Sequence, residues 1–327
     1  MLLAGDVGGT KTILAIFEQT GIRAPLAQET YISQQYPDLG TMASEFLAQT
    51  GLAVERAVFG VAGPVVQGRV TGTNLPWELS ESALARTLDI PSVTLINDLV
   101  ALSYGVLVLE PEDLVTLNEG HCEPGGAIAV IAPGTGLGEG FLTWDGSRYR
   151  AHPSEGGHTE FGPTDELQIG LLTYLYKRLG HVSLERVCSG RGLPNIYAYL
   201  KERDYALEPP WLTERLAHAP DPTPVIITAA LQEDPPCPLC RATMQTFVRI
   251  LGAEAGNLAL RVMATAGVYI AGGIPPRILP FLQGGALLKA FCNKGRLSYV
   301  MREIPLYVVL NPETALMGAA SYGLAQP

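Results

Sequence analysis

Apolar positions along the first hundred residues switch repeatedly between the spacing of a strand and that of a helix. Short buried strands are predicted at residues 1–5, 12–18, 25–33, 56–63 and 93–97. Apolar residues three and four apart predict helices at 38–51, at 79–88 and from Asp98 onward. Strands that alternate with helices in this way indicate an α/β fold.

The second half of the chain continues the alternation with longer helices. Residues 240–267 form a helical run in which Gly252 and Gly256 lie one turn apart and permit close packing of a neighbour. The last helix is predicted to follow a strand and to have Asn311 as its N-cap. Prolines cluster within residues 203–240, so this stretch is the most loop-like region of the chain, and we interpret it as an excursion of the second domain rather than a linker.

A glycine-rich turn joins the first two predicted strands. The stretch GDVGGTKT, residues 5–12, nearly matches the phosphate-binding pattern G-x-x-x-x-G-K-[ST], but Thr10 stands in place of the second glycine. A P-loop lysine begins a helix, whereas Lys11 is followed by a predicted strand, so the stretch is the turn of a β-hairpin. Gly8 and Gly9 can take positive φ and direct successive N–H groups toward an anion. An ordinary hairpin turn explains the same residues, so both interpretations stay open.

A second unit of strand, glycine turn and strand occupies residues 126–146, with Gly134, Thr135 and Gly136 in the turn. It begins about 128 residues after the first unit, and 327 residues suggest two domains. Two similar domains that face each other would hold a polyphosphate from both sides. The turn is not a dinucleotide fingerprint, because Glu139 replaces the third glycine and no helix follows.

Asn97 and Asp98 stand where a predicted strand ends and a helix begins. In open α/β sheets, ligands bind at the carboxyl ends of the strands, so a carboxylate here is well placed for a substrate. Asp and Asn are also the favoured N-cap residues of helices. The residues alone leave a catalytic role and a capping role open.

The stretch SEGGHTEFGP, residues 154–163, gathers Glu155, His158 and Glu160 around two glycines. Glu-x-x-His binds metals when it lies on a helix, and the two glycines disfavour a helix. A carboxylate and an imidazole on a shaped loop suit a polyhydroxy ligand, since one accepts hydrogen bonds and the other accepts or donates them. A solvated surface loop is the alternative. Glu185, in SLERVCSGRG, carries no signal by itself.

Composition narrows the classes of partner and compartment. The formal net charge of -10 disfavours binding to nucleic acid, and no apolar run is long enough for a membrane span. The five cysteines do not suggest a disulfide framework. Cys237 and Cys240 form a lone C-x-x-C without a second ligand pair, so we expect reduced thiols without zinc and a cytoplasmic protein.

Seven motifs in order resemble those of bacterial glucokinases, in the hexokinase–actin–chaperone ATPase superfamily. They are GDVGGT, LINDLVAL, APGTGLG, SEGGHTEF, ERVCSGRGLPNIY, IAGGIPPR and NPETALMGAA, and they cover nearly the whole chain. The resemblance implies an actin-like ATPase (ribonuclease H-like) α/β fold with a cleft between two domains. The smaller domain is expected at residues 1–107 plus 303–327, and the larger at 108–302.

The resemblance also implies roles for individual residues. The first phosphate site is expected at Asp6, Gly8, Gly9 and Thr10, the second at Gly134, Thr135 and Gly136, and the nucleoside at Gly272 and Gly273. Asp98 matches the catalytic base of the family. The expected sugar ligands are Asn74, Asn97, Asp98, Glu155, His158 and Glu185. Asp6 is expected to bind Mg²⁺ through water.

The activity implied is Mg²⁺-dependent transfer of a phosphoryl group from ATP to the 6-hydroxyl of glucose, by a glycolytic homodimer. Lys11 follows the first turn as in the related repressor–kinase family, but the cysteine-rich zinc site of that family does not follow His158. The alternatives are a kinase for another hexose or an N-acetylated hexosamine, and a non-catalytic sugar-sensing ATP-binding protein. A transcriptional regulator is disfavoured because only five residues precede Asp6. ADP or polyphosphate remains possible as the donor.

Overall fold

The computed structural model describes residues 1–18, 21–71 and 76–326. The chain forms two compact units. Unit 1 comprises Met1–Pro111, Ala151–Pro153 and Asn311–Pro327, and unit 2 comprises Glu112–Arg150 and Ser154–Leu310. The domain boundaries expected from the sequence remain a prediction. They place the strand Leu306–Val309 in the smaller domain, whereas this strand pairs within the sheet of unit 2.

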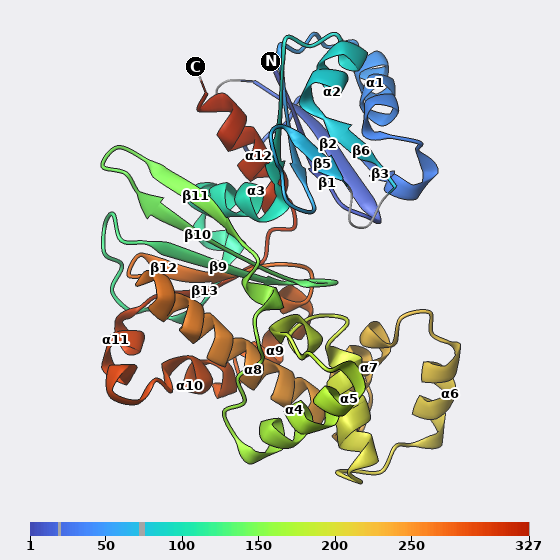
Figure 1. Ribbon diagram of the computed structural model, residues 1–327, viewed down its shortest axis with the longest axis vertical. Helices are drawn as coiled ribbons and strands as arrows, with labels where there is room; N and C mark the ends of the chain where they lie inside the picture. The colour runs from blue at the N-terminus through green and yellow to red at the C-terminus, as the bar shows by residue number, and fades with distance from the viewer. Residues whose placement is uncertain (19–20, 72–75, 327) are drawn as a thin grey trace. The chain divides into compact units, whose positions relative to one another are not determined.

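Unit 1 is built on a five-stranded sheet (Figure 1). In spatial order, its strands are β3 (Ala27–Ile32), β2 (Lys11–Phe17), β1 (Leu2–Val7), β4 (Arg56–Val61) and β7 (Ser92–Asn97). Strands β1, β2 and β3 pair antiparallel, whereas β4 and β7 run parallel to β1, so the carboxyl ends of β1, β4 and β7 share one edge. A small separate sheet consists of β5 (Arg69–Thr71) and β6 (Glu78–Ser80).

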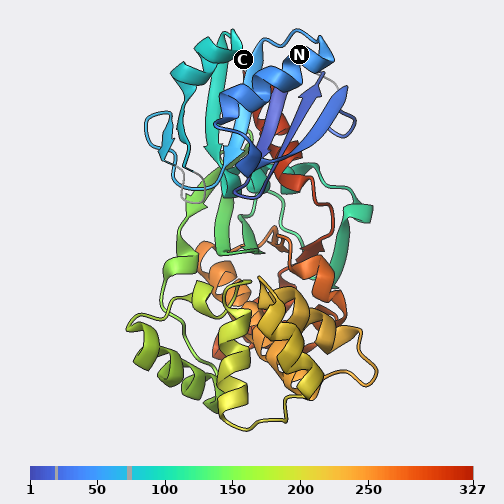
Figure 2. The same cartoon turned by 90° about the vertical axis from the view of Figure 1, so that its right-hand side faces the viewer.

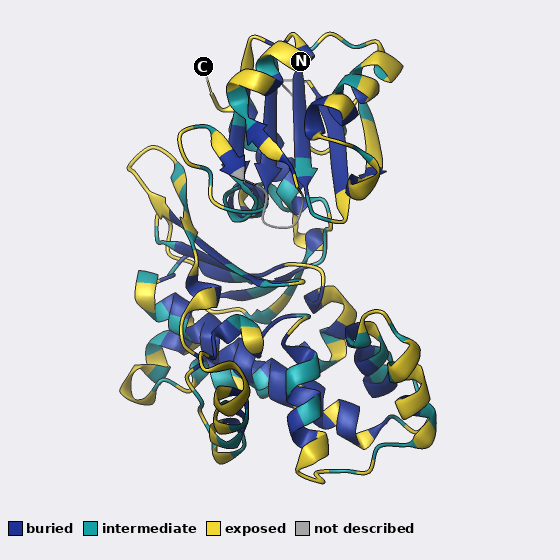
Figure 3. Ribbon diagram, turned by 45° about the vertical axis from the view of Figure 1, so that its right-hand side comes forward, coloured by how far each residue is buried: buried dark blue, intermediate teal, exposed yellow. Residues whose placement is uncertain are grey.

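Helices cover both faces of this sheet because its strands are apolar on both sides. Helices α1 (Leu39–Thr50) and α2 (Glu81–Leu88) pack on the face that includes Leu3 and Val7. Helices α3 (Asp98–Gly105) and α12 (Thr314–Leu324) pack on the face that includes Leu2 and Ala4. Figure 3 shows the strands as mostly buried and the outer helix surfaces as exposed. The predicted end of α1 at Gly51 is confirmed, with a left-handed φ of 65°.

Unit 2 repeats the strand order of unit 1. The sequence of strands across its sheet is β11 (Tyr149–Ser154), β10 (Leu137–Trp144), β9 (Ile128–Pro133), β12 (Gly267–Ile270), β13 (Leu306–Val309) and β8 (Leu114–Asn118). As in unit 1, the hairpin β9–β10 is antiparallel and the next two strands run parallel to β9. The inference from sequence of two similar halves is confirmed, and β8 is an added edge strand.

The helices of unit 2 gather on one side of its sheet (Figure 2). They are α4 (Glu166–Leu179), α5 (Leu193–Glu202), α6 (Pro210–His218), α7 (Pro222–Leu231), α8 (Pro238–Val262), α9 (Leu279–Leu282), α10 (Ala286–Cys292) and α11 (Ser298–Glu303). The close packing expected at Gly252 and Gly256 is confirmed. A Cβ on Gly252 would lie 2.3 Å from the Leu287 carbonyl oxygen of α10, and a Cβ on Gly256 would lie 2.6 Å from the Phe291 carbonyl oxygen of the same helix.

Two expectations about local structure are wrong. The stretch 203–240, interpreted as the most loop-like region, contains the two helices α6 and α7, which begin at Pro210 and Pro222. Proline at the start of a helix loses no hydrogen bond and has a suitable φ, so these prolines initiate helices. The N-cap of α12 is Glu313 rather than Asn311, whose side chain instead accepts a hydrogen bond from the Glu313 N–H at 2.9 Å.

Candidate active site

The first glycine turn, residues 8–10, joins β1 to β2. The predicted hairpin is confirmed, since Lys11 begins a strand and not a helix, and β1 extends beyond the expected end to Val7. Gly8 does not have a left-handed φ, so the expected reason for glycine is wrong here. Instead, a Cβ on Gly8 would lie 2.9 Å from the Lys11 carbonyl oxygen, which accepts a hydrogen bond from the Gly8 N–H at 3.0 Å.

Ser33, which no sequence pattern indicated, hydrogen-bonds to this turn. Its hydroxyl donates to the Gly8 carbonyl at 2.7 Å and lies 2.9 Å from the Thr12 hydroxyl oxygen, and its N–H donates to the Thr10 carbonyl at 3.0 Å. Ser33 and Thr12 are fully buried. Because the carbonyls of Gly8 and Thr10 both accept hydrogen bonds from Ser33, the backbone of the turn is held in one conformation. No sequence motif marks Ser33, because its role depends on strand β3 lying beside β2.

Asp6 lies in β1, two residues before the turn. The alternation of side chains along a strand places it on the same face as Leu2 and Ala4, the face that α3 and α12 cover. Burial raises the pKa of Asp6 to about 6, and the positive charge of Lys11 opposes this effect. The carboxylate is therefore costly to keep ionised without a cation nearby.

Asn97 and Asp98 lie where β7 ends and α3 begins, as predicted. Val7, Val61 and Asn97 occupy matched positions in the parallel strands, so the first turn and Asp98 follow the same edge of the sheet. This is the edge at which open α/β sheets bind ligands.

The structure assigns the capping role to Asn97. Its side-chain oxygen accepts from the N–H groups of Leu99 at 2.9 Å and Val100 at 3.3 Å, and its amide donates to the Gly63 carbonyl at 3.1 Å. Asp98 is the first helical residue, and one of its oxygens accepts from the Leu99 N–H at 3.0 Å. Helix capping therefore explains Asn97 and does not explain why an aspartate stands at position 98.

In unit 2, the second glycine turn joins β9 to β10 as expected. The Gly134 N–H donates to the Gly136 carbonyl at 2.9 Å, which closes the turn. The segment after Glu185 supports it, because the N–H groups of Gly190 and Arg191 donate to the carbonyls of Gly134 and Thr135 at 2.8 and 3.3 Å. These contacts bring together two segments about 50 residues apart in the sequence.

Glu185 lies against this turn. Its Oε2 accepts from the Leu137 N–H at 3.1 Å, and a Cβ on Gly136 would lie 2.4 Å from the same oxygen. Glycine at position 136 therefore makes room for the carboxylate. The structure thus places Glu185, which only the family resemblance had indicated, beside the second glycine turn.

The predicted polyhydroxy-binding stretch forms a short 3₁₀ turn, Gly156–His158. A Cβ on Gly157 would lie 2.1 Å from the Leu137 carbonyl oxygen, so this turn packs directly on the start of β10. The side chains of Glu155 and His158 are mostly exposed, and their Oε2 and Nε2 atoms are 3.9 Å apart. Leu137 therefore contacts both this turn and Glu185.

Gly272 and Gly273 follow β12, also next to the second turn. Gly272 has a φ of 90°, and a Cβ there would lie 2.7 Å from the Pro133 carbonyl oxygen. The N–H of Ile274 donates to this same carbonyl at 3.3 Å. A Cβ on Gly273 would meet no atom within 4 Å, so one side of this loop is open. Asn74, the remaining predicted sugar ligand, lies outside the described residues.

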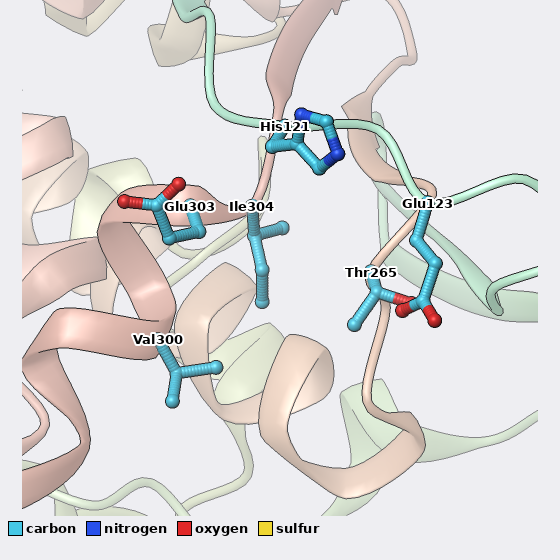
Figure 4. Close-up of a pocket in the computed structure, with 6 residues that line it drawn as sticks. All are labelled: His121, Glu123, Thr265, Val300, Glu303 and Ile304. Atoms are coloured by element: carbon cyan, nitrogen blue, oxygen red, sulfur yellow. The ribbon is translucent and has the colours of Figure 1, made fainter.

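A cavity of about 350 Å³ in unit 2 lies away from these residues. Its lining consists of His121, Glu123, Thr265, Val300, Glu303 and Ile304 (Figure 4). Thr265 and Ile304 precede β12 and β13, so the cavity is at the amino ends of these strands, whereas Gly272 follows the carboxyl end of β12. The carboxylates of Glu123 and Glu303 lie on opposite sides of Ile304 in Figure 4. The cavity includes none of the predicted site residues.

The described part of the chain contains no group of three or more histidine, cysteine, aspartate or glutamate side chains that could hold a metal ion. Cys237 and Cys240, the lone C-x-x-C, are buried at the start of α8.

Among the described residues, no helix has both the length and the apolar character needed to cross a lipid bilayer.

Comparison with known proteins identifies the family. A family model described as Glucokinase matches residues 3–326. A glucokinase of Nostoc punctiforme is 42% identical over 335 residues, which cover 98% of this chain and 98% of that protein.

Solved structures agree with this result. The crystal structure of a glucokinase from an Antarctic psychrotroph has a TM-score of 0.83 and 28% identity, covering 99% of both chains. A ROK family glucokinase from Streptomyces griseus, in complex with glucose and AMPPNP, has a TM-score of 0.64 and 21% identity, covering 98% of both chains, and supports the fold alone. The predicted actin-like ATPase fold class is confirmed, and the chain belongs to the glucokinase family.

Proposed function

We propose that this protein transfers the γ-phosphoryl group of ATP to the 6-hydroxyl of glucose. The observation that carries the proposal is that three candidate site segments of unit 2 meet at Leu137. The turn with Gly157 packs on its carbonyl, Glu185 binds its N–H, and the turn Gly134–Gly136 directly precedes it. Carboxylates suited to hydroxyl groups therefore lie beside a glycine turn suited to phosphates. Membership of the glucokinase family supports the same activity.

In the reaction, the 6-hydroxyl oxygen forms a bond to the γ-phosphorus while the bond from that phosphorus to ADP breaks. Asp98 accepts the hydroxyl proton. Its placement as the first residue of α3, with the cap supplied by Asn97, supports this role. Phosphoryl transfer depends mostly on positioning and charge stabilisation, so a weak base is sufficient.

The two glycine turns bind the phosphates through backbone N–H groups. These donors carry no charge, which is compatible with a chain of formal net charge -10. Gly272 and Gly273 flank the nucleoside, and the open space beside Gly273 supports this assignment. Because the chain belongs to the glucokinase family, we infer that it binds glucose and ATP together.

Mg²⁺ neutralises phosphate charge when it is bound. The residues of this chain fit such an ion, because Asp6 offers a partly buried carboxylate, two residues before the first glycine turn, on the face of the sheet toward α3. Mg²⁺ retains several waters and binds proteins through one or two carboxylates, so a larger cluster of protein ligands is not needed. Asp6 would hold the ion through water.

The direct test of the function is the formation of glucose 6-phosphate from glucose, using ATP, ADP and polyphosphate in turn as donors. A panel with mannose, fructose and N-acetylglucosamine measures the strictness for glucose. If no glucose 6-phosphate forms from glucose and ATP, the proposal is contradicted.

We expect Glu155→Gln and Glu185→Gln to raise the glucose KM at least tenfold, with a smaller change in the ATP KM. A hydrogen bond to a charged acceptor contributes ~1.5–3 kcal/mol, which corresponds to this effect. Steady-state kinetics with each substrate varied will measure the two KM values. Glu160→Gln is the matched control, because Glu160 is on the same loop with its side chain 86% exposed. An unchanged glucose KM in both variants would remove these residues from the sugar site.

We expect Ser33→Ala to raise the ATP KM about three- to tenfold and to leave the glucose KM within about twofold, since one hydrogen bond to the first turn contributes about 1 kcal/mol. The hydroxyl that binds the Gly8 carbonyl is removed while the backbone contact with Thr10 remains. Ser147→Ala, at an exposed turn, is the control. Equal changes in both KM values would show that Ser33 does not act through the first turn.

We further propose that the enzyme acts in glycolysis as a homodimer in a reducing cytoplasm. The five free cysteines support the compartment. Sedimentation velocity at several protein concentrations will test the oligomeric state.

A further inference from the structure

Glu139 is a buried carboxyl group that the proposed mechanism does not use. It lies in β10, two residues after Leu137, and is only 1% exposed. Alternation along the strand directs its side chain to the same face as Leu137, where the helices of unit 2 pack. An acidic residue at such a position is unusual, because ionised carboxylates are rarely fully buried unless they are paired.

Neither oxygen of Glu139 has a hydrogen-bond partner among the described residues. The nearby cation, Arg261, approaches Oε2 only to 4.0 Å, whereas it lies 2.7 Å from an oxygen of Glu254. Asn257 donates to the other oxygen of Glu254 at 2.9 Å. Arg261 is therefore bound to Glu254, which is the arrangement expected when Glu139 carries no charge.

The other groups around Glu139 reinforce this conclusion. Burial, and then the charge of Glu254, raise the pKa of Glu139 to about 7, and Arg261 opposes them. Cys188, on the loop after Glu185, is fully buried, and its thiol pKa is raised by burial and by the two carboxylates. Lys294 lies beside α8, the helix that carries Glu254 and Arg261, and donates to the side-chain oxygen of Asn257 and to the Ala253 carbonyl. With a pKa raised to about 7, Glu139 is expected to change its charge near neutral pH.

The carboxyl group of Glu139 directly supports the turn that carries two proposed sugar ligands. A Cβ on Gly156 would lie 1.9 Å from Oε2 of Glu139, so the side chain touches the backbone there. Gly156 is also held by two hydrogen bonds: the Ser154 hydroxyl oxygen accepts from its N–H at 3.0 Å, and the Thr159 hydroxyl donates to its carbonyl at 2.7 Å. Glu155 immediately precedes this glycine.

Ionisation of Glu139 would disturb this arrangement. Two buried carboxylates would then compete for Arg261, and the charged oxygens of Glu139 would require hydrogen bonds that the present packing does not provide. Movement of Glu139 is transmitted to Gly156, because their atoms are in contact. Glu155 and His158 would move with the turn.

We propose that Glu139 is a positioning residue for the sugar site, and that the charge on its carboxyl group controls the affinity for glucose by supporting or displacing the turn Gly156–His158. The inference rests on the proposed function of that turn. Below pH 7, Glu139 is neutral and glucose binding is tight. As the pH rises through 7, the group ionises and binding weakens.

The experiment compares wild type with Glu139→Gln between pH 6 and pH 8.5. We expect the glucose KM of wild type to rise about fivefold or more across this range, a coupling of ordinary size, while the ATP KM changes less than about twofold. Glu139→Gln, which cannot ionise, removes this rise. Glu254→Gln relieves the repulsion and releases Arg261, so it shifts the midpoint of the rise to lower pH. Glu160→Gln, on the same loop and exposed, retains the wild-type profile.

A second readout keeps the test independent of catalysis. The backbone NMR signals of Gly156 and Gly157, without sugar, should titrate with a midpoint near pH 7 in wild type and not in Glu139→Gln. If Glu139→Gln does not fold, Glu139→Met, which is also uncharged and of similar length, replaces it. An unchanged pH profile in the uncharged variant, or equal changes in both KM values, would overturn the proposal. If wild type does not phosphorylate glucose, the proposed function fails, and the glycine titration alone then decides whether Glu139 controls the turn.

Discussion

Asp98→Asn is expected to lower kcat by ~10² or more, because it removes the proton acceptor of the reaction. The folded structure should remain, since Asn97 and not Asp98 caps α3. The oxygen of an asparagine can still accept from the Leu99 N–H, as Asp98 does at 3.0 Å. We expect glucose binding within about tenfold of wild type, because only the charge is removed. Steady-state kinetics, a glucose titration and the melting temperature will measure the three properties.

Asn97→Ala is the matched variant for this test. It should lower stability by about 1 kcal/mol, the usual contribution of an N-cap, and affect glucose binding more than kcat. A near-normal kcat in Asp98→Asn would leave the reaction without its named base. A large loss of melting temperature in the same variant would show that Asp98 also has a structural role.

Gly157→Ala is expected to lower kcat/KM for glucose by ~10², since displacement of a binding group by about 1 Å can have this effect. The added Cβ would lie 2.1 Å from the Leu137 carbonyl oxygen, which is backbone and cannot rotate away. The turn must shift, and the strain should also lower stability by ~1–3 kcal/mol. Kinetics with glucose and with ATP varied, together with urea unfolding, will measure both effects.

Gly162→Ala is the control for the glycine substitution, because a Cβ at that position on the same loop would meet no atom within 4 Å. It should match wild type in glucose kinetics and stability. Gly157→Ala with normal glucose kinetics would contradict the packing of the turn on β10 as a determinant of sugar binding. A loss that is equal for glucose and ATP would indicate general unfolding instead.

The sequence by itself determined the order of strands and helices in unit 1, because each element there has a local cause. Apolar spacing and Gly51 define α1, and the strand after Lys11 excluded a P-loop. The recurrence of a glycine turn about 128 residues later revealed two similar halves, and the sheet orders agree. Local patterns failed where one residue type has two uses, as at Pro210 and Pro222, which start helices in the stretch interpreted as the most loop-like.

Only the tertiary structure decided which residues support the candidate site. Local pattern gives Glu185 no role and only the family resemblance indicated it; the structure shows that its carboxylate binds the Leu137 N–H at the start of β10. Ser33 supports the first turn because β3 lies beside β2. Glu139 appeared in the sequence only as a residue that breaks a dinucleotide motif. Its contact with Gly156 and its 4.0 Å distance from Arg261 arise because α8 and the turn pack on one strand. Such contacts join residues far apart in the chain, and their energies depend on burial and distance, which a local pattern of side chains does not contain.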